Sequence, residues 1–289
     1  MLYLLFSILC STLIFIVFKA FSRFGINNVY AIVANYIAAT TMGFIFGEFP
    51  STMHEVLSKD WILAAFFIGF LFIALFQIMA LTAQRLGVSR VSVPVKMSVV
   101  LPVLVGVWLY DEKLNAASII GIVLALVAVY LGTRKIEDHA ATSSLLVMLL
   151  PAVLFFGNGS IDVLLKYAQS NWLAQSEMAL FSSVLFASAF IWGIFFFTKE
   201  WISIKKGPKF KDVLGGIALG IPNFGSIYFL LEALDKSGMQ SASVYPINNV
   251  AIVGLSAVSG LLIYKEHLSR INIVGLICGV VSIFLIAYA

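Results

Sequence analysis

Long apolar runs separated by short polar loops cover almost the whole chain. Each run is long enough to cross roughly 30 Å of hydrocarbon at about 1.5 Å per residue. The pattern therefore predicts an all-α polytopic membrane protein with ten transmembrane helices. The predicted helices cover residues 1–18, 28–46, 61–83, 88–110, 116–132, 143–167, 177–198, 213–234, 240–264 and 271–288.

One stretch of this pattern occurs twice, about 150 residues apart. The first copy contains Pro94, Tyr110-Asp111-Glu112-Lys113-Leu114 and Gly121, and the second contains Pro246, Tyr264-Lys265-Glu266-His267-Leu268 and Gly275. A long-period repeat indicates two similar halves, predicted at 1–138 and 139–289. Because five helices per half is an odd number, the second half must enter the membrane from the opposite side. The sequence thus predicts two inverted five-helix repeats, a design of many secondary transporters.

Composition excludes a soluble protein. Hydrophobic residues make up 61% of the chain and charged residues 11%, and the mean hydropathy is +1.04, whereas soluble domains carry about 25% charged residues. The pI of about 9.0 comes from basic residues in short loops, which sets topology and predicts no nucleic-acid partner. Cys10 and Cys278 lie inside apolar runs, so we expect no disulfide, metal site or cofactor.

The loop charges predict an orientation in a bacterial inner membrane. Thirteen lysines and arginines lie in loops on one side, against Lys59, Lys113, Lys166 and Lys236 on the other. The positive-inside rule makes the first side cytoplasmic, with both termini outside the cytoplasm. The thirteen are Lys19, Arg23, Arg85, Arg90, Arg134, Lys135, Lys199, Lys205, Lys206, Lys209, Lys211, Lys265 and Arg270.

Ionisable and amide side chains inside the runs are the candidate site, because burying them in a bilayer is costly. Lys96 follows Pro94 by two residues: it either lines a central cavity and meets an anionic group, or extends toward the basic loop at its helix end. At the matching place in the second half lie Tyr245, Pro246, Asn248 and Asn249, which either line the cavity or pair across helices.

The sixth predicted helix contains Asn158 and Asp162. Asp162 is a candidate for proton coupling, but it also lies four residues from Lys166 and could form an ordinary ion pair with it. Further buried candidates for the pathway are Asn35, Gln77, Asn223 and Tyr228. Pro94, Pro222 and Pro246 are candidate hinges.

Support for enzyme chemistry is lacking. The three histidines lie in separate loops, and neither a His-Glu-x-x-His pair nor a Gly-Lys-Ser/Thr phosphate loop occurs. Glu112 and Glu266 come as a pair, but both fall at predicted helix ends, where we expect solvated side chains. No catalytic residue is predicted.

The two halves, each with Pro, an apolar run, Glu-x-Leu and Gly, resemble the drug/metabolite transporter superfamily, and specifically its EamA-type ten-helix members. Ala80-Leu81, Ala233-Leu234, Lys19 and Lys166 share in this resemblance. It implies a transporter of a small organic metabolite, amino-acid-like or another polar or anionic solute, commonly exported. Family members usually keep both termini in the cytoplasm, which the loop charges of this chain contradict.

Together these observations predict a secondary active transporter that works by alternating access at a central cavity between the repeats. Its expected partners are a small-molecule substrate, the lipid bilayer and, through Asp162, protons; a monomer and a homodimer both fit. Two alternatives stay open: a lipid flippase of the same fold, and a polytopic membrane protein or enzyme that transports nothing.

Overall fold

The computed structural model describes residues 2–46, 53–110, 115–133, 145–172, 177–236 and 241–287, and within these ranges every regular element is a helix. The predicted all-α class is confirmed for this part of the chain. The helices are α1 (Leu2–Phe24), α2 (Asn28–Phe46), α3 (Met53–Leu57), α4 (Ile62–Leu86), α5 (Val88–Met97), α6 (Val100–Tyr110), α7 (Ala116–Thr133), α8 (Leu145–Asn171), α9 (Met178–Ile204), α10 (Phe210–Lys236), α11 (Ser241–Tyr264) and α12 (Arg270–Ala287).

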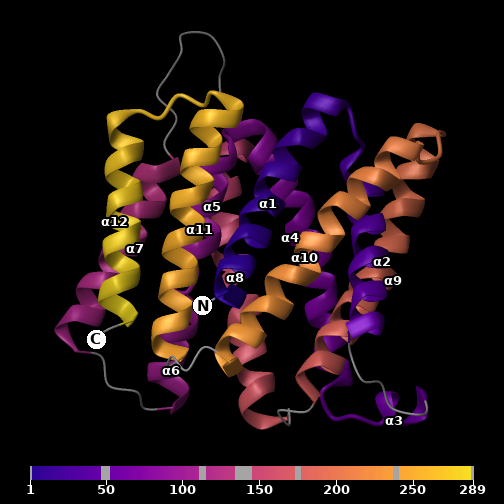
Figure 1. Cartoon of the computed structure of the whole chain (residues 1–289), viewed down its shortest axis with the longest axis horizontal. Coiled ribbons are helices and arrows are strands. Elements are labelled where there is room, and N and C mark those ends of the chain that lie inside the picture. Colours follow the sequence, from indigo (N-terminus) through magenta and orange to yellow (C-terminus); the bar gives the residue numbers. More distant parts are fainter. Residues whose placement is uncertain are drawn as a thin grey trace.

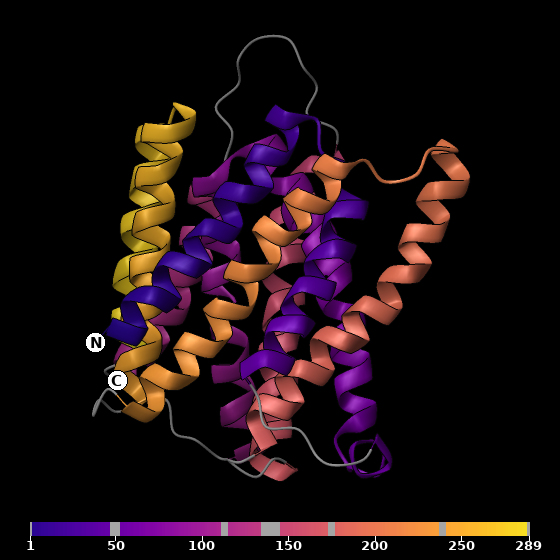
Figure 2. The same ribbon diagram turned by 45° about the vertical axis from the view of Figure 1, so that its right-hand side comes forward.

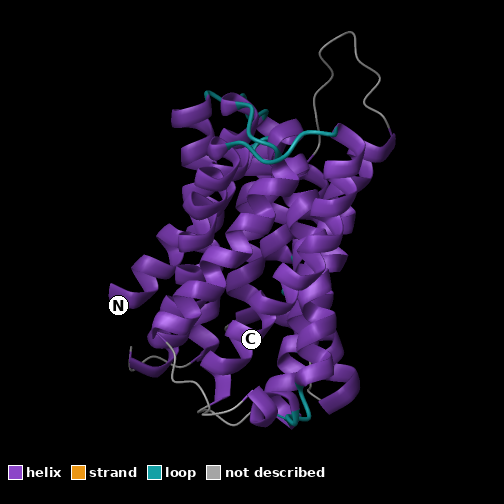
Figure 3. Cartoon of the chain, turned by 90° about the vertical axis from the view of Figure 1, so that its right-hand side faces the viewer, coloured by secondary structure: helices purple, strands orange, loops and turns teal. Residues whose placement is uncertain are grey.

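The helices are long and apolar enough for a polytopic membrane protein. Among the described residues, seven stretches qualify as membrane spans by length and hydropathy: those in α1, α2, α4, α9, α10 and α11, and one that runs from α5 into α6. Shorter apolar helices occur in α7, α8 and α12. All lie side by side in one bundle, while the short α3 lies at one end of it (Figures 1 and 3).

Several helices extend beyond their apolar runs. The first run was predicted to end at residue 18, yet α1 continues to Phe24. It ends at Gly25, whose φ of 58° suits glycine, and the amide of Ile26 donates to the carbonyl of Phe21 at 2.9 Å. The hydrogen-bonded backbone, rather than the first charged side chain, therefore decides where the helix stops.

Close packing in the bundle relies on small residues. The helix α2 lies against both α9 and α10, α4 against α8 and α9, and α7 against α12. A side chain at Gly216 or Gly220 of α10 would collide with the backbone of α2 near Ala31 and Asn35. Since lipid offers no hydrophobic drive for helix association, such close contacts supply much of the packing energy.

The basic loops gather at one end of the bundle, which we call the basic end; it comprises residues 25–27, 87, 205–209 and 265–269. Lys211 Nζ donates to the carbonyl of Phe24 at 2.9 Å, and Arg90 donates to the carbonyl of His267 at 3.2 Å. The opposite end holds α3, and the two marked chain ends lie in the half of the bundle nearer to it (Figure 1). Loops predicted to share one side of the membrane thus lie at one end of the structure.

Candidate functional site

The helix that carries Lys96 is interrupted. It was predicted as one helix over 88–110, but α5 ends at Met97 and α6 begins at Val100. Pro102 explains the gap, because it has no amide to donate to the carbonyl of Ser98 and its ring crowds that carbonyl. Leu101 donates to Ser98 instead, at 2.9 Å, in a tighter turn. The repeated motif pointed to Pro94 as the bend, whereas the interruption lies at Pro102, which the sequence pattern did not single out.

Lys96 and Asp162 lie beside this interruption. Lys96 is in the last turn of α5 and Asp162 is on α8, and these two helices pack against each other. The two opposite charges therefore lie on adjoining helices, without forming an ion pair at direct contact distance. Ser98 Oγ lies 3.3 Å from Asp162 Oδ2 and 2.7 Å from the carbonyl of Val95, so its hydroxyl can donate to either. Both charged side chains are half-buried. The proximity of Lys96 to Asp162 could not be predicted from the sequence pattern, which offered Lys166 as the partner of Asp162.

Asn158 lies one helical turn before Asp162 on α8. Its side-chain nitrogen donates to the carbonyl of Leu154 in the same helix, at 2.9 Å. The glycines on either side have a packing role, because a side chain at Gly157 or Gly159 would meet Leu75 of α4 or Leu101 of α6. The Gly-Asn-Gly sequence thus lets α8 approach two helices of the first half.

Asn248 lies where α1, α10 and α11 meet. It lies buried on α11, and Ser7 Oγ of α1 is 3.3 Å from its Oδ1 and 2.9 Å from the carbonyl of Ser226 on α10. Asn249 beside it is half-buried. Tyr245 and Pro246 fall within α11, which continues without interruption, but their side chains lie outside the described part of the structure, as does that of Lys166.

Asn35 and Asn223 form an interhelical pair. Both are buried, and Asn223 Nδ2 donates to Asn35 Oδ1 at 3.2 Å, while Asn35 Nδ2 donates to the carbonyl of Ile32 at 3.4 Å. These bonds link the two amides across the contact between α2 and α10. Pro222 precedes Asn223 inside α10, which continues across it.

Gln77 and Tyr228 were matched by their places in the repeat, and the structure gives them different surroundings. Gln77 Nε2 is buried and meets no acceptor among the described residues, so it offers a donor to a ligand or water. The ring of Tyr228 stacks on Phe224 and contacts Phe46 and Phe229. Tyr228 is therefore part of an aromatic cluster on α10.

The glutamate of the second repeated motif binds the start of α5. Glu266 accepts the amide of Val88 at 2.7 Å, the amide of Ser89 at 3.3 Å and the hydroxyl of Ser89 at 3.1 Å. Its carboxylate also lies against Gly87, which has a φ of 106°. A carboxylate at a helix N-terminus is favourable because it meets free amides and the positive end of the dipole. The prediction that Glu266 is solvated was wrong; Glu112 lies outside the described residues.

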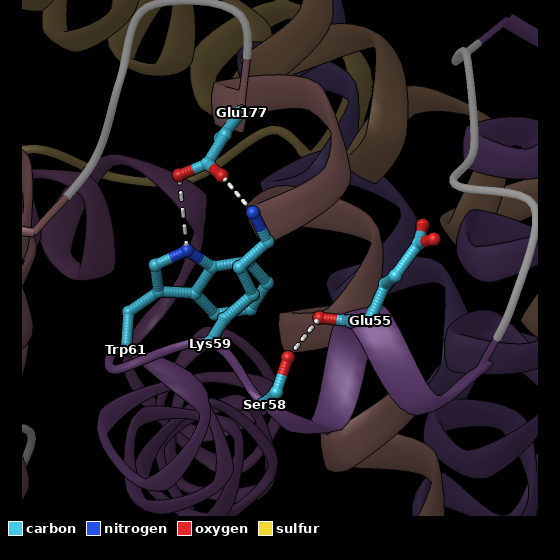
Figure 4. A network of polar contacts seen from close by, with 5 residues as sticks. All are labelled: Glu55, Ser58, Lys59, Trp61 and Glu177. Carbon is cyan, nitrogen blue, oxygen red and sulfur yellow. Dashed lines mark hydrogen bonds and ion pairs between the residues drawn. The ribbon is translucent and has the colours of Figure 1, made fainter.

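A second carboxylate joins the halves at the opposite end (Figure 4). Glu177, at the start of α9, accepts Lys59 Nζ at 2.5 Å and Trp61 Nε1 at 3.3 Å. Trp61 is almost fully buried, and the Glu55 carboxylate points away from the pair. The hydrogen bond and charge of Glu177 raise the pKa of Lys59 above its ordinary value of 10.5.

Candidate ligands for a metal ion do not cluster anywhere in the described ranges. Cys10 and Cys278 are free and half-buried, on α1 and α12. What this part of the chain brings together is a charged pair beside an interrupted helix, with carboxylate contacts between the halves at both ends.

These features define a polytopic α-helical membrane protein with an ionisable pair inside it. Residues 1–134 match the model of the EamA-like transporter family, which lies within the drug/metabolite transporter superfamily. The resemblance drawn from the repeated motifs is thereby confirmed over these residues. The chain is also 28% identical over 293 residues to a protein of Haemophilus influenzae described as uncharacterized, covering 99% of this chain and 97% of the relative.

Proposed function

We propose that this protein is a secondary active transporter for small polar organic solutes, with its binding site at Lys96 and Asp162. The observation that carries the proposal is geometric: Lys96 on α5 and Asp162 on the adjoining α8 both lie beside the interruption between α5 and α6, with Ser98 Oγ 3.3 Å from the Asp162 carboxylate. Interrupted helices at membrane depth expose backbone polar groups and are typical of transporter binding sites.

The proposed architecture is ten spans in two inverted repeats, 1–138 and 139–289. In these repeats α1, α2 and α4 would correspond to α8, α9 and α10. The helix packing agrees with this correspondence, because α1 and α2 both lie against α10, and their counterparts α8 and α9 both lie against α4. In the same way α5 packs on α7, and their counterparts α11 and α12 pack on each other. Each of these pairs relates helices that would be equivalent in the two repeats.

Alternating access would open one end of the bundle at a time. Glu266 joins α5 to the second half at the basic end, and Glu177 joins the start of α4 to α9 at the opposite end. Lys96 lies about 12 Å from the start of α5 by helical rise. We propose that the site lies between these two contacts, and that each contact breaks when its end opens.

The chemistry of the pair suggests the substrate class. An ammonium such as Lys96 suits a carboxylate or phosphate, and a carboxylate such as Asp162 suits a cation or a proton. A metabolite that carries both charges, such as an amino-acid-like solute, could satisfy both residues at once. We propose export as the direction, with Asp162 as the proton-carrying group.

Flux of a labelled metabolite panel in proteoliposomes, with and without a pH gradient, tests the proposal. Wild type is compared with Lys96→Met and Asp162→Asn. Gradient-driven flux that Asp162→Asn abolishes supports proton coupling at Asp162. Flux that ignores both substitutions would remove the site from Lys96 and Asp162, and transbilayer movement of labelled lipid with no metabolite flux would favour a flippase.

A further inference from the structure

The segment from Lys199 to Lys211, which connects α9 to α10, carries five lysines among exposed apolar side chains. Trp201 is 54% exposed, Ile202 68% and Phe210 78%. Figure 2 shows the last turns of α9 leaning away from the other helices at the basic end. The lysines and the exposed apolar side chains therefore lie together where the end of α9 leaves the bundle.

Two acidic residues, Glu200 within this segment and Asp212 directly after it, face the protein rather than the lysines. Glu200 accepts the side-chain nitrogen of Asn27 at 2.7 Å, and Asp212, only 3% exposed, accepts the amides of Asn27 and Lys209, each at 2.8 Å. Both carboxylates are thus held at the turn between α1 and α2. They fix the loop in place without neutralising its ammonium groups.

Further contacts hold the backbone of the loop. Tyr30 Oη donates to the carbonyl of Lys206 at 2.6 Å, and Lys205 adopts a φ of 54° as it ends α9. Lys211 caps α1 at Phe24. Within the described ranges no carboxylate lies at ion-pair distance from the other four lysines, which are Lys199, Lys205, Lys206 and Lys209. The lysine loop, as we call residues 199–209, is a fixed scaffold with four free ammonium groups.

We propose that the lysine loop binds the headgroups of anionic phospholipids. The lipid-facing surface of α9 continues directly into the loop, with Ile191, Phe195 and Ile202 all exposed along it. Acyl chains can lie along this surface while the phosphate meets the ammonium groups above it. Clusters of lysines directly after a membrane helix attract anionic lipid in this way, and salt weakens the attraction. The proposal is independent of what the protein transports.

Lipid retention by the purified protein tests this surface. Native mass spectrometry would count phosphatidylglycerol and phosphatidylcholine bound after equal exposure to each. The variants are Lys199→Gln/Lys205→Gln/Lys206→Gln/Lys209→Gln and, as the matched control, the same four positions changed to Arg. We expect at least threefold lower phosphatidylglycerol retention in the Gln variant, wild-type retention in the Arg variant, and no change for phosphatidylcholine.

Equal phosphatidylglycerol retention in wild type and the Gln variant would overturn the proposal, as would a wild type that does not distinguish the two lipids. Competition by millimolar inorganic phosphate would also overturn it, since the surface would then be a general anion site. Thermal unfolding in phosphatidylcholine checks that the variants fold. If the Gln variant does not fold, the four single Lys→Gln variants are compared, and the proposal requires a graded loss of phosphatidylglycerol.

Discussion

Lys96 and Asp162 matter at the scale of single residues, because opposite charges on adjoining helices lower the cost of burying one another. A charge left alone in a low-dielectric site costs far more than a neutral polar group, so removing one partner is worse than removing both. We expect Lys96→Met to lower the free energy of unfolding by about 2–4 kcal/mol, toward the low end because both side chains are only half-buried. Thermal unfolding in detergent measures the loss.

The double variant Lys96→Met/Asp162→Asn is the control for this prediction. If the two charges stabilise each other, it recovers much of the stability that either single change loses. Additive losses in the double variant would contradict the pairing and leave Lys166 as the partner of Asp162.

The Lys59–Glu177 contact allows a pH prediction. Because the folded-state pKa of Lys59 lies above 10.5, the stabilisation from its charge is fully present below that value and disappears as the pH rises through the folded-state pKa. We expect the difference in melting temperature between wild type and Lys59→Gln to be constant from pH 8 to about 10 and to shrink above it. The difference should be small, because the Lys59 side chain is 35% exposed. A difference that grows above pH 10.5 would contradict this prediction.

At the scale of elements, the junction of α4 and α5 depends on glycine. Gly87 has φ 106° and ψ 164°, a conformation that costs other residues of order 1–3 kcal/mol, and a side chain there would displace the Glu266 carboxylate. We expect Gly87→Ala to destabilise the protein by roughly 2 kcal/mol or more. Gly207→Ala is the matched control, because Gly207 has open space around it. Equal melting temperatures for the two variants would show that the junction tolerates a side chain.

The interruption between α5 and α6 gives a second prediction at this scale. Pro102→Ala supplies an amide for the carbonyl of Ser98, so α5 and α6 should join into one helix. We expect unfolding free energy to change by no more than about 1 kcal/mol, the net worth of one hydrogen bond, while solute flux in proteoliposomes falls strongly. Pro94→Ala is the comparison. If Pro94→Ala abolishes flux and Pro102→Ala does not, the functional bend lies at Pro94, as the sequence pattern first indicated.

These elements also show which features of the structure could be predicted from the sequence. Apolar runs locate the helices, because lipid-facing and core positions are both apolar and only loops are polar. They do not locate helix ends, as α1 and α9 show, since backbone hydrogen bonding continues past charged residues. Lys96, Asp162 and Asn248 could be singled out as costly inside a membrane. Their partners could not, because Ser98 and Ser7 are common residues whose roles depend on which helices touch.

At the scale of the whole molecule, inversion of the repeats and orientation are separate questions. The described basic residues that were assigned to the cytoplasmic side meet at the basic end through bonds such as Lys19 to the carbonyl of Gln84, at 3.1 Å. The gathering of these residues at one end follows from the order of the helices in the bundle and does not depend on the direction of insertion. Which end faces the cytoplasm depends on insertion, where loop lysines and arginines act. The loop charges predict the reverse of the orientation that is usual in the family this chain resembles.

Cysteine labelling decides the orientation. With Cys10 and Cys278 replaced by Ala, Gly207→Cys places one thiol at the basic end and Ser58→Cys places one at the opposite end, both on exposed loop residues. We expect a membrane-impermeant maleimide to label Ser58→Cys in intact cells and Gly207→Cys only after the membrane is opened, because the basic loops resist translocation. The reverse pattern would put both termini in the cytoplasm, and would mean that something other than loop charge sets the direction of insertion. Labelling of both thiols in intact cells would mean that the chain inserts both ways, which an excess of thirteen basic residues over four on one side should prevent.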